Sequence, residues 1–263
     1  MLIVAERINA SRKGIREAIK TRDESFIKKE ASNQANAGGD YIDVNAGGSS
    51  DEAEALKWLV ELVQQATDKP LCLDSADPKV IKQVIAGCKM PPMINSMTLE
   101  PYRLEPILSL VAEHGARVIG LCQSEEGMGR TLDTKLALAD RLVEKVTGFG
   151  INIENLYIDP LIFPLSTDSK AAVVSLEAID RIMTEFPGVH TICGLTNISY
   201  ALPARKLVNR NFLVCALFRG LDAAILDPTD DALYAALRSG DMLLGRDDYC
   251  MSFISAYRKG RLV

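Results

Sequence analysis

The 263-residue sequence predicts an α/β fold, a closed (β/α)8 barrel, on three observations. Short apolar runs of strand type alternate eight times with segments of helical periodicity. The runs are almost continuously apolar, as expected for strands of a parallel sheet that is buried on both faces. The length is typical of one such barrel, and no linker rich in Pro, Gly or Ser divides the chain. We therefore expect one domain over residues 1–263.

Eight predicted strands follow one another from the N-terminus. They are Leu2–Ile8, Tyr41–Ala46, Leu71–Ser75, Met93–Ser96, Arg117–Cys122, Leu156–Asp159, Thr191–Asn197 and Ala223–Asp227. An open, doubly wound sheet is the alternative for alternating strands and helices. Such a sheet usually has fewer repeats and often a G-x-G-x-x-G turn after its first strand, which this chain lacks.

Helical periodicity marks the segments between these strands, because apolar residues recur there every three or four positions. The clearest apolar stripes are Leu56, Leu59, Val60 and Val63; Val80, Ile81, Val84 and Ile85; Leu136, Ala139, Val143 and Val146; and Phe212, Cys215 and Ala216. Asp77 and Pro78 read as an N-cap and the first helical residue, and Gly220 as the residue after a helix end.

An extra helix is expected after the eighth strand–helix unit, at about 247–258. Its large side chains are Tyr249, Met251, Phe253, Ile254 and Tyr257. We expect them to pack on the barrel or on a second subunit.

Composition excludes several classes of protein. The net charge is −5 without a Lys/Arg run, which argues against a nucleic-acid partner. The N-terminus lacks the features of a signal peptide, and no run approaches the roughly 18 apolar residues of a membrane span, so we expect a cytoplasmic protein. The six cysteines are scattered without a C-x-x-C pair and there are two histidines. Most thiols are therefore expected to be small buried side chains, and no bound metal is expected.

A polar group ends every predicted strand, and in a (β/α)8 barrel these ends converge on the face that carries the chemistry. Among them are Asn9, Asn45, Asp74, Asn95, Gln123, Asp159, Asn197, Ser199 and Asp227. Arg7 is the only cation at these ends. Such a set suits an uncharged ligand rich in donors and acceptors, such as an aminopyrimidinone ring, because a carboxylate accepts hydrogen bonds from adjacent ring N–H and NH2 groups.

Individual carboxylates at strand ends also have structural interpretations. Asp77 and Asp230 are expected to cap helices. Glu6 and Asp43 are expected to pair with Arg7 or lysines at the rim, and Asp227 fits the same role. The combination of Asp74, Asn95, Asp159 and Asn197 stands apart, because all four close strongly apolar runs and capping alone does not require that.

The same residues carry a family resemblance. The segments LCLDS (71–75), MINS (93–96), LYIDPLI (156–162) and GLTNIS (194–199) resemble the pterin-binding signatures of methyltetrahydrofolate:corrinoid-protein methyltransferases. ERIN (6–9), IDVNAG (42–47) and VNRNFL (208–213) fit the same pattern, so the resemblance runs through essentially the whole chain. This group of pterin-binding TIM barrels includes dihydropteroate synthase and the folate domain of cobalamin-dependent methionine synthase.

The resemblance implies a role for each motif residue. Asp74, Asn95 and Asp159 are expected to bind the pyrimidine part of the pterin. Asn197 is expected to lie near N5 as the catalytic residue, since its amide can donate or accept a hydrogen bond. The other polar residues of the rim complete the expected substrate-binding set, and they are Gln123, Ser199, Asn9 and Asn45. No general acid stands out at the rim, so N5 is expected to take its proton from solvent.

The resemblance also implies the partners. In this family a methyl group passes between N5 of methyltetrahydrofolate and the cobalt of a corrinoid (cobalamin), in one-carbon metabolism or in demethylation, including O-demethylation. The chain lacks the D-x-H-x-x-G cobalamin signature, so a partner corrinoid protein is expected to bring that cofactor to the barrel mouth. Members are commonly homodimers, and Trp58 or the C-terminal aromatic residues are candidates for that interface.

Three other functions compete with methyl transfer. Dihydropteroate synthase needs cations for a leaving pyrophosphate, but the eighth strand runs into acidic Asp227–Asp231 and the AGGSS loop lacks that family's expected carboxylate. A non-catalytic folate carrier would keep the pterin carboxylates and would not need Asn197. A sugar-phosphate barrel would need a glycine-rich, cation-bearing loop after strands seven and eight, and neither loop fits.

Overall fold

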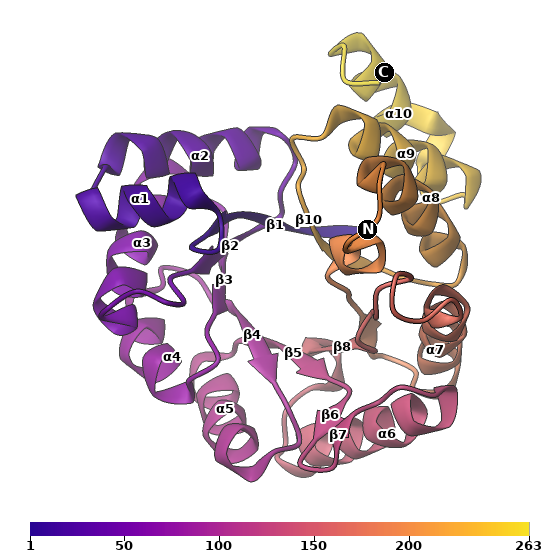
Figure 1. Ribbon diagram of the computed structural model, residues 1–263, viewed down its shortest axis with the longest axis horizontal. Helices are drawn as coiled ribbons and strands as arrows, with labels where there is room; N and C mark the ends of the chain where they lie inside the picture. The colour runs from indigo at the N-terminus through magenta and orange to yellow at the C-terminus, as the bar shows by residue number, and fades with distance from the viewer. Residues whose placement is uncertain (263) are drawn as a thin grey trace.

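The computed structural model describes residues 1–262, and it shows a barrel of parallel strands inside a ring of helices (Figure 1). Eight strands pair in the order β10-β1-β2-β3-β4-β5-β8-β9. The two outer strands approach each other, because Ile225 N donates to Cys193 O at 2.9 Å and Gly194 forms a parallel bridge with Ile225. The predicted (β/α)8 barrel is therefore confirmed.

Seven of the eight barrel strands lie within one residue of their predicted bounds. The barrel strands are β1 (Leu2–Asn9), β2 (Tyr41–Asn45), β3 (Leu71–Asp74), β4 (Met93–Met97), β5 (Arg117–Leu121), β8 (Leu156–Asp159), β9 (His190–Thr191) and β10 (Ala223–Leu226). A short hairpin of β6 (Gln123–Ser124) and β7 (Gly127–Met128), which was not predicted, follows β5.

The seventh strand was predicted too long. The run Thr191–Asn197 contains only the end of β9, and its second half belongs to the 3-10 helix η3 (Leu195–Ser199). The backbone turns there because Asn197 N donates to Gly194 O at 3.2 Å and Tyr200 N donates to Asn197 O at 3.1 Å. An apolar run alone does not distinguish such a turn from a buried strand.

Ten α-helices surround the strands among the described residues. They are α1 (Lys13–Thr21), α2 (Glu24–Asn36), α3 (Glu52–Ala66), α4 (Pro78–Val84), α5 (Pro101–His114), α6 (Leu132–Gly148), α7 (Ala171–Glu185), α8 (Arg205–Phe218), α9 (Asp231–Leu243) and α10 (Met251–Arg258), with short 3-10 helices η1 (Ile85–Gly87), η2 (Ile153–Asn155) and η4 (Asp248–Cys250). Asp77 caps α4 and Asp230 caps α9, as predicted. No helix within residues 1–262 is long and apolar enough to cross a membrane.

The predicted apolar stripes of α3 and α4 with η1 are buried, but the stripe predicted for α6 is only half right, since Ala139 and Val146 alone among its four residues are fully buried. Leu136 and Val143 are only half-buried. The buried face of α6 consists of Lys135, Leu138, Ala139, Leu142 and Val146. Lys135 occupies one position of that face. A prediction from hydrophobicity alone therefore chose the neighbouring row, which contains Leu136 and Val143.

Two further predictions need correction. All six cysteines are free, but only Cys72, Cys122 and Cys193 are buried. The predicted C-terminal helix is present as α10, preceded by η4, but the side chains of Tyr249 and Tyr257 are exposed and do not pack on the barrel. Packing of these side chains on a second subunit, the other alternative, stays a prediction. The helix contacts α9 through a narrow face that includes the buried Ala256.

The interior of the barrel positions the site. One layer of apolar side chains points inward from the strands, and it consists of Val4, Tyr41, Cys72, Met93, Ile119, Tyr157, Ile192 and Ala223. Since side chains alternate between faces along a strand, the residues two positions later also point inward, one layer closer to the carboxyl ends. That next layer contains Glu6, Asp43, Asp74, Asn95 and Asp159.

Candidate functional site

The carboxyl ends of β2, β3 and β4 bring three polar side chains to one level. Asn45 pairs with Asp74 across β2 and β3, and Asp74 pairs with Asn95 across β3 and β4. Asp159 ends β8 at the level of Leu121, beyond the intervening strand β5. The four strand-end residues therefore face a common barrel mouth.

A cavity of about 290 Å³ opens at this mouth. It is lined by Glu6, Asn9, Ser11, Arg12, Asp43, Asp74, Asn95, Thr196 and Ile225. Its volume is at the lower end of the roughly 300–1,000 Å³ typical of small-molecule sites. Three predicted site residues, Asn9, Asp74 and Asn95, thus share one cavity.

The surroundings of Asp74 shift the pKa of its carboxyl group. Burial raises its pKa from 3.8 to about 6, the Asn45 hydrogen bond and the Arg103 guanidinium lower it, and Glu52 raises it. The Asn45 side chain also accepts from Gly47 N at 2.9 Å, so it links the β2 loop to Asp74. Asn45 thereby supports Asp74, although it does not line the cavity.

Asp159 is buried, with 7% of its surface exposed. Its Oδ1 accepts a hydrogen bond from Leu161 N at 2.7 Å. Burial raises its pKa to about 6, while the Leu161 and Gly194 N–H groups and the Lys135 ammonium lower that pKa. One carboxylate oxygen is thus fixed by the backbone of the following turn, which orients the group.

Asp43 and Glu6 were expected to pair with Arg7 or lysines at the rim. That expectation was wrong for both, because Arg7 pairs with Glu30 and Asp227. Asp43 is 2% exposed, and its Oδ1 has no hydrogen-bond partner among residues 1–262. Burial and then the Asp74 charge raise its pKa well above 3.8. Glu6 does lie 3.5 Å from Arg12, yet burial raises its pKa to about 7. Both carboxyl groups line the cavity in a state that favours a bound proton.

Asn197 lies in η3 and is exposed at the mouth. Its Nδ2 atom lies over Gly194, where an added Cβ would approach it to 3.1 Å. The neighbouring Thr196 lines the cavity. Because the Gly194 N–H also lowers the pKa of Asp159, the Asn197 amide and the Asp159 carboxylate both lie near Gly194.

Five of the eight predicted site residues do not line the cavity, namely Asn45, Gln123, Asp159, Asn197 and Ser199. The side chains of Gln123 and Ser199 are held by other protein groups. The Gln123 amide donates to Glu100 Oε1 at 3.2 Å. The Ser199 hydroxyl donates to Thr196 O at 3.2 Å and accepts from Arg205 Nε at 3.1 Å, inside η3. Their role in binding stays a prediction. The described residues contain no group of three or more His, Cys, Asp or Glu side chains that could hold a metal ion.

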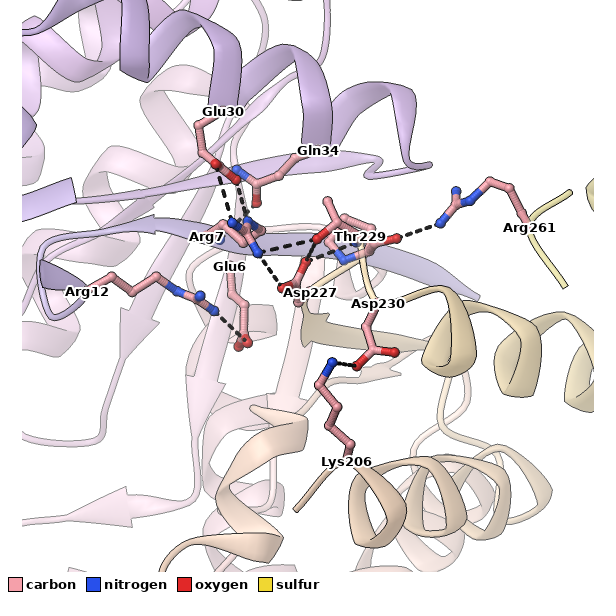
Figure 2. A network of polar contacts seen from close by, with 11 residues as sticks. Glu6, Arg7, Arg12, Glu30, Gln34, Lys206, Asp227, Thr229, Asp230 and Arg261 are labelled. Carbon is pink, nitrogen blue, oxygen red and sulfur yellow. Dashed lines mark hydrogen bonds and ion pairs between the residues drawn. The ribbon is translucent and has the colours of Figure 1, made fainter. Parts of the chain in front are cut away.

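An ion-pair network braces the rim between β1, α2 and β10 (Figure 2). Arg7 bonds to Glu30 and, at 2.9 Å, to Asp227, while Thr229 donates to Asp227 at 2.6 Å. Gln34 Oε1 accepts from Arg7 N at 2.8 Å. The structural role predicted for Asp227 is confirmed, and its pKa lies below 3.8 because the Thr229 and Arg7 hydrogen bonds outweigh burial.

Arg7 is not the only cation at the mouth, because residues after the strands also reach it. Arg12 lines the cavity. Arg103 donates to Ser96 O at 2.7 Å, and Arg205 donates to Thr196 O at 2.9 Å. Arg12 lies just before α1, Arg103 in α5 and Arg205 at the start of α8, so their approach to the strand ends depends on the three-dimensional fold.

Comparisons with known proteins agree with this geometry. Residues 5–227 match the sequence family described as pterin binding enzymes. The chain belongs to the pterin-binding enzyme family. The matched region extends from the middle of β1 to the residue that follows β10, so it contains the other seven barrel strands and every residue that lines the cavity. An enzyme with a pterin-binding barrel is what the motif residues predicted.

Two relatives are similar to this pterin-binding enzyme over most of its length. It is 36% identical to the methylcorrinoid:tetrahydrofolate methyltransferase of Eubacterium limosum over 265 aligned positions, which cover 100% of this chain and 98% of the relative. It is 32% identical to methionine synthase of Mycobacterium tuberculosis, where the match covers 86% of this chain and 20% of that longer protein. The family resemblance predicted from the motifs is therefore confirmed.

Solved structures show the same fold. The dihydropteroate synthase of Vibrio fischeri has a TM-score of 0.68 at 14% identity, with 93% of each chain covered. That of Xanthomonas albilineans has a TM-score of 0.67 at 18% identity, covering 90% of this chain and 92% of the other. At these identities the similarity extends to the barrel fold alone.

Proposed function

We propose that this enzyme transfers a methyl group between N5 of tetrahydrofolate and the cobalt of a corrinoid carried by a partner protein. The observation that carries the proposal is the single cavity that joins Asp74 and Asn95, with Asp159 at the end of β8, two strands away from β4 on the same barrel mouth. The full-length relative named for this exchange supports the choice of reaction. The pterin ring would occupy the cavity, and the reacting N5 would face Asn197.

The donors and acceptors in the cavity match a pterin. Asp74 and Asp159, each with a pKa of about 6, are mainly ionised at neutral pH and accept hydrogen bonds from ring N–H and amino groups. Asn95 can donate to the ring carbonyl or accept from an N–H. Asp159 is buried and Asp74 and Asn95 are half-buried, so an incorrectly paired ligand leaves a polar group without a partner and binds weakly.

Proton supply at N5 decides the chemistry of the folate. A tertiary amine is a poor leaving group. It gives up its methyl group readily only when N5 gains a proton or a strong hydrogen bond. Glu6, with a pKa of about 7, holds a proton in about half of the molecules at neutral pH. We assign Glu6 as the proton source through solvent in the cavity, and Asn197 as the donor that steadies N5. In the reverse direction the Glu6 carboxylate accepts, through solvent, the proton that N5 releases, and the Asn197 amide oxygen accepts a hydrogen bond from N5–H.

The corrinoid supplies, when its carrier is bound, the cobalt that exchanges the methyl group. A cavity of about 290 Å³ accommodates a bicyclic ring and not a macrocycle of corrin size. The chain's part is therefore to hold the folate with N5 exposed at the mouth, so that a partner protein can approach it. Alignment of the two reactants supplies much of the rate enhancement in such a bimolecular step.

The cellular setting is proposed from the relatives. The name of the Eubacterium limosum protein describes methyl transfer from a methylcorrinoid to tetrahydrofolate, and we propose that direction here, as part of a demethylation or another one-carbon pathway. We also propose a cytoplasmic homodimer with one barrel per subunit.

The reaction is tested with purified protein, methyltetrahydrofolate and free cob(I)alamin under anaerobic conditions. Loss of the cob(I)alamin absorption in proportion to enzyme supports methyl transfer. Tight folate binding without transfer, even with candidate corrinoid proteins present, would show a carrier instead. Incorporation of labelled p-aminobenzoate would show dihydropteroate synthase.

A further inference from the structure

Lys135 is a fully buried lysine in the first turns of α6, with no exposed surface. Its Nζ donates to three backbone carbonyls: Gly129 at 2.9 Å, Pro160 at 2.5 Å and Leu161 at 2.9 Å. An ammonium has three N–H donors, so each one has an acceptor. A buried charge is tolerated when its hydrogen bonds are complete in this way.

Two of the three carbonyls belong to the turn that follows β8. In that turn Leu161 has a φ of 63°, a left-handed conformation that a residue with a Cβ seldom adopts. The N–H of Leu161 is the group that donates to Asp159 Oδ1 at 2.7 Å. Lys135 therefore stabilises an unfavourable backbone conformation at Leu161. In that conformation the Leu161 N–H fixes the orientation of Asp159.

We propose that Lys135 is a positioning residue for folate binding, which acts by holding the Pro160–Leu161 turn so that Asp159 presents its free carboxylate oxygen to the pterin. The inference rests on the proposed function, because it assigns Asp159 to the ring. It adds a residue outside the cavity whose removal should change how the site binds.

Charge gives Lys135 a second effect on Asp159. The Lys135 ammonium lowers the pKa of that carboxyl group, in opposition to burial. The other titratable groups near this pair are Cys122 and Cys193, whose thiols have pKa values raised by burial, and Arg130, which faces the lysine. The thiols are neutral at pH 7, so the Lys135 ammonium is the charged group that, together with the Leu161 N–H, lowers the pKa of Asp159 against the effect of burial.

The test is the affinity for tetrahydrofolate as a function of pH, measured by anaerobic calorimetry on the full chain. Lys135→Met should bind at least tenfold more weakly at pH 7, and the loss of affinity at low pH should begin at a higher pH than in the wild type. Lys135→Arg, which keeps the charge and several donors, should restore most of the affinity.

Two variants of the same helix separate positioning from stability. Lys145→Met removes an exposed lysine, and Leu142→Ala destabilises the buried face away from the cavity. Both should keep the wild-type pH dependence. If Lys135→Met binds like the wild type, or loses affinity equally at every pH as a merely destabilised protein would, the inference is wrong. If it does not fold, Lys135→Gln, with two donors and no charge, provides the same comparison.

Failure of the proposed function gives a different result. Wild-type protein that binds no tetrahydrofolate would overturn the function, and the pKa of Asp159 measured by carbon NMR would still report on Lys135. A pKa of Asp159 unchanged between wild type and Lys135→Gln would refute the positioning role by itself.

Discussion

Replacement of Asp159 by Asn should weaken folate binding and stabilise the fold at the same time. The oxygen of the introduced amide can keep the hydrogen bond from Leu161 N, which leaves the amide NH2 group facing the ring N–H groups that the carboxylate accepted. Hydrogen bonds to a charged group contribute about 1.5–3 kcal/mol, so the affinity for tetrahydrofolate should fall by roughly 10- to 150-fold.

The effect of Asp159 on stability has the opposite sign. Its pKa rises from 3.8 to about 6 on folding. Between those values the folded state binds more protons than the unfolded state, so this group makes the protein less stable as pH rises through the window. A rise of that size corresponds to about 3 kcal/mol as an upper limit. Asn carries no charge and removes this penalty, so the melting temperature at pH 7.5 should rise.

Calorimetric titration with tetrahydrofolate and thermal unfolding at pH 7.5 measure the two effects. Asp140→Asn, an exposed change on α6, serves as the control and should alter neither. An unchanged affinity would show that Asp159 does not touch the ligand. A lower melting temperature with weaker binding would show that Asp159 is a structural residue whose loss damages the site indirectly.

Three more results are expected. Asn197→Ala should slow methyl transfer by about 2–4 kcal/mol of barrier with little change in folate affinity, as loss of an oxyanion-type donor does, and equal losses in both would refute its catalytic role. Gly194→Ala places a Cβ 3.1 Å from Asn197 Nδ2, so single-turnover rates should fall, most of all at saturating folate; wild-type rates would show that the amide does not need its present position. Transfer from methyltetrahydrofolate should decline as pH rises through about 7, where Glu6 loses its proton, and Glu6→Gln should abolish that limb of the profile; a retained limb would point to another acid.

The positions of Asp74 and Asn95 were predictable because two local rules suffice for them. Strand periodicity places a residue on the inner face, and parallel strands end at one rim. Both residues follow inward-facing Cys72 and Met93 by two positions, and their strands are neighbours. The sequence therefore contained the geometry of this pair before any tertiary contact was known.

The ionisation of Glu6 and Asp43 was not predictable in the same way. Both lie at inward positions, but a partner such as Arg7 was equally consistent with their place in the chain. In the structure Arg7 turns to Glu30 and Asp227, so Asp43 has no cation of its own, and desolvation then raises its pKa. Which carboxylate obtains the arginine depends on α2 and β10, elements far away in sequence.

Lys135 is a buried residue that a hydrophobic pattern cannot identify. It occupies the phase of the buried face of α6, three residues before Leu138 and seven before Leu142. A lysine at such a position is usually assigned to the solvent face. Its acceptors are carbonyls of an irregular turn, and a turn of that kind leaves no periodic signal in the sequence.

The arginines at the mouth already bind protein groups, and this bears on whether the site can hold a leaving pyrophosphate. Arg7 pairs with Asp227, and Arg12 approaches Glu6. Arg103 and Arg205 each direct a terminal nitrogen at a backbone carbonyl. A leaving pyrophosphate would have to displace these contacts and would also face the ionised Asp74 of the cavity, which repels it. A pterin ring and a methyl group impose neither cost, so the distribution of charge at the mouth favours methyl transfer over the reaction of the structurally similar dihydropteroate synthases.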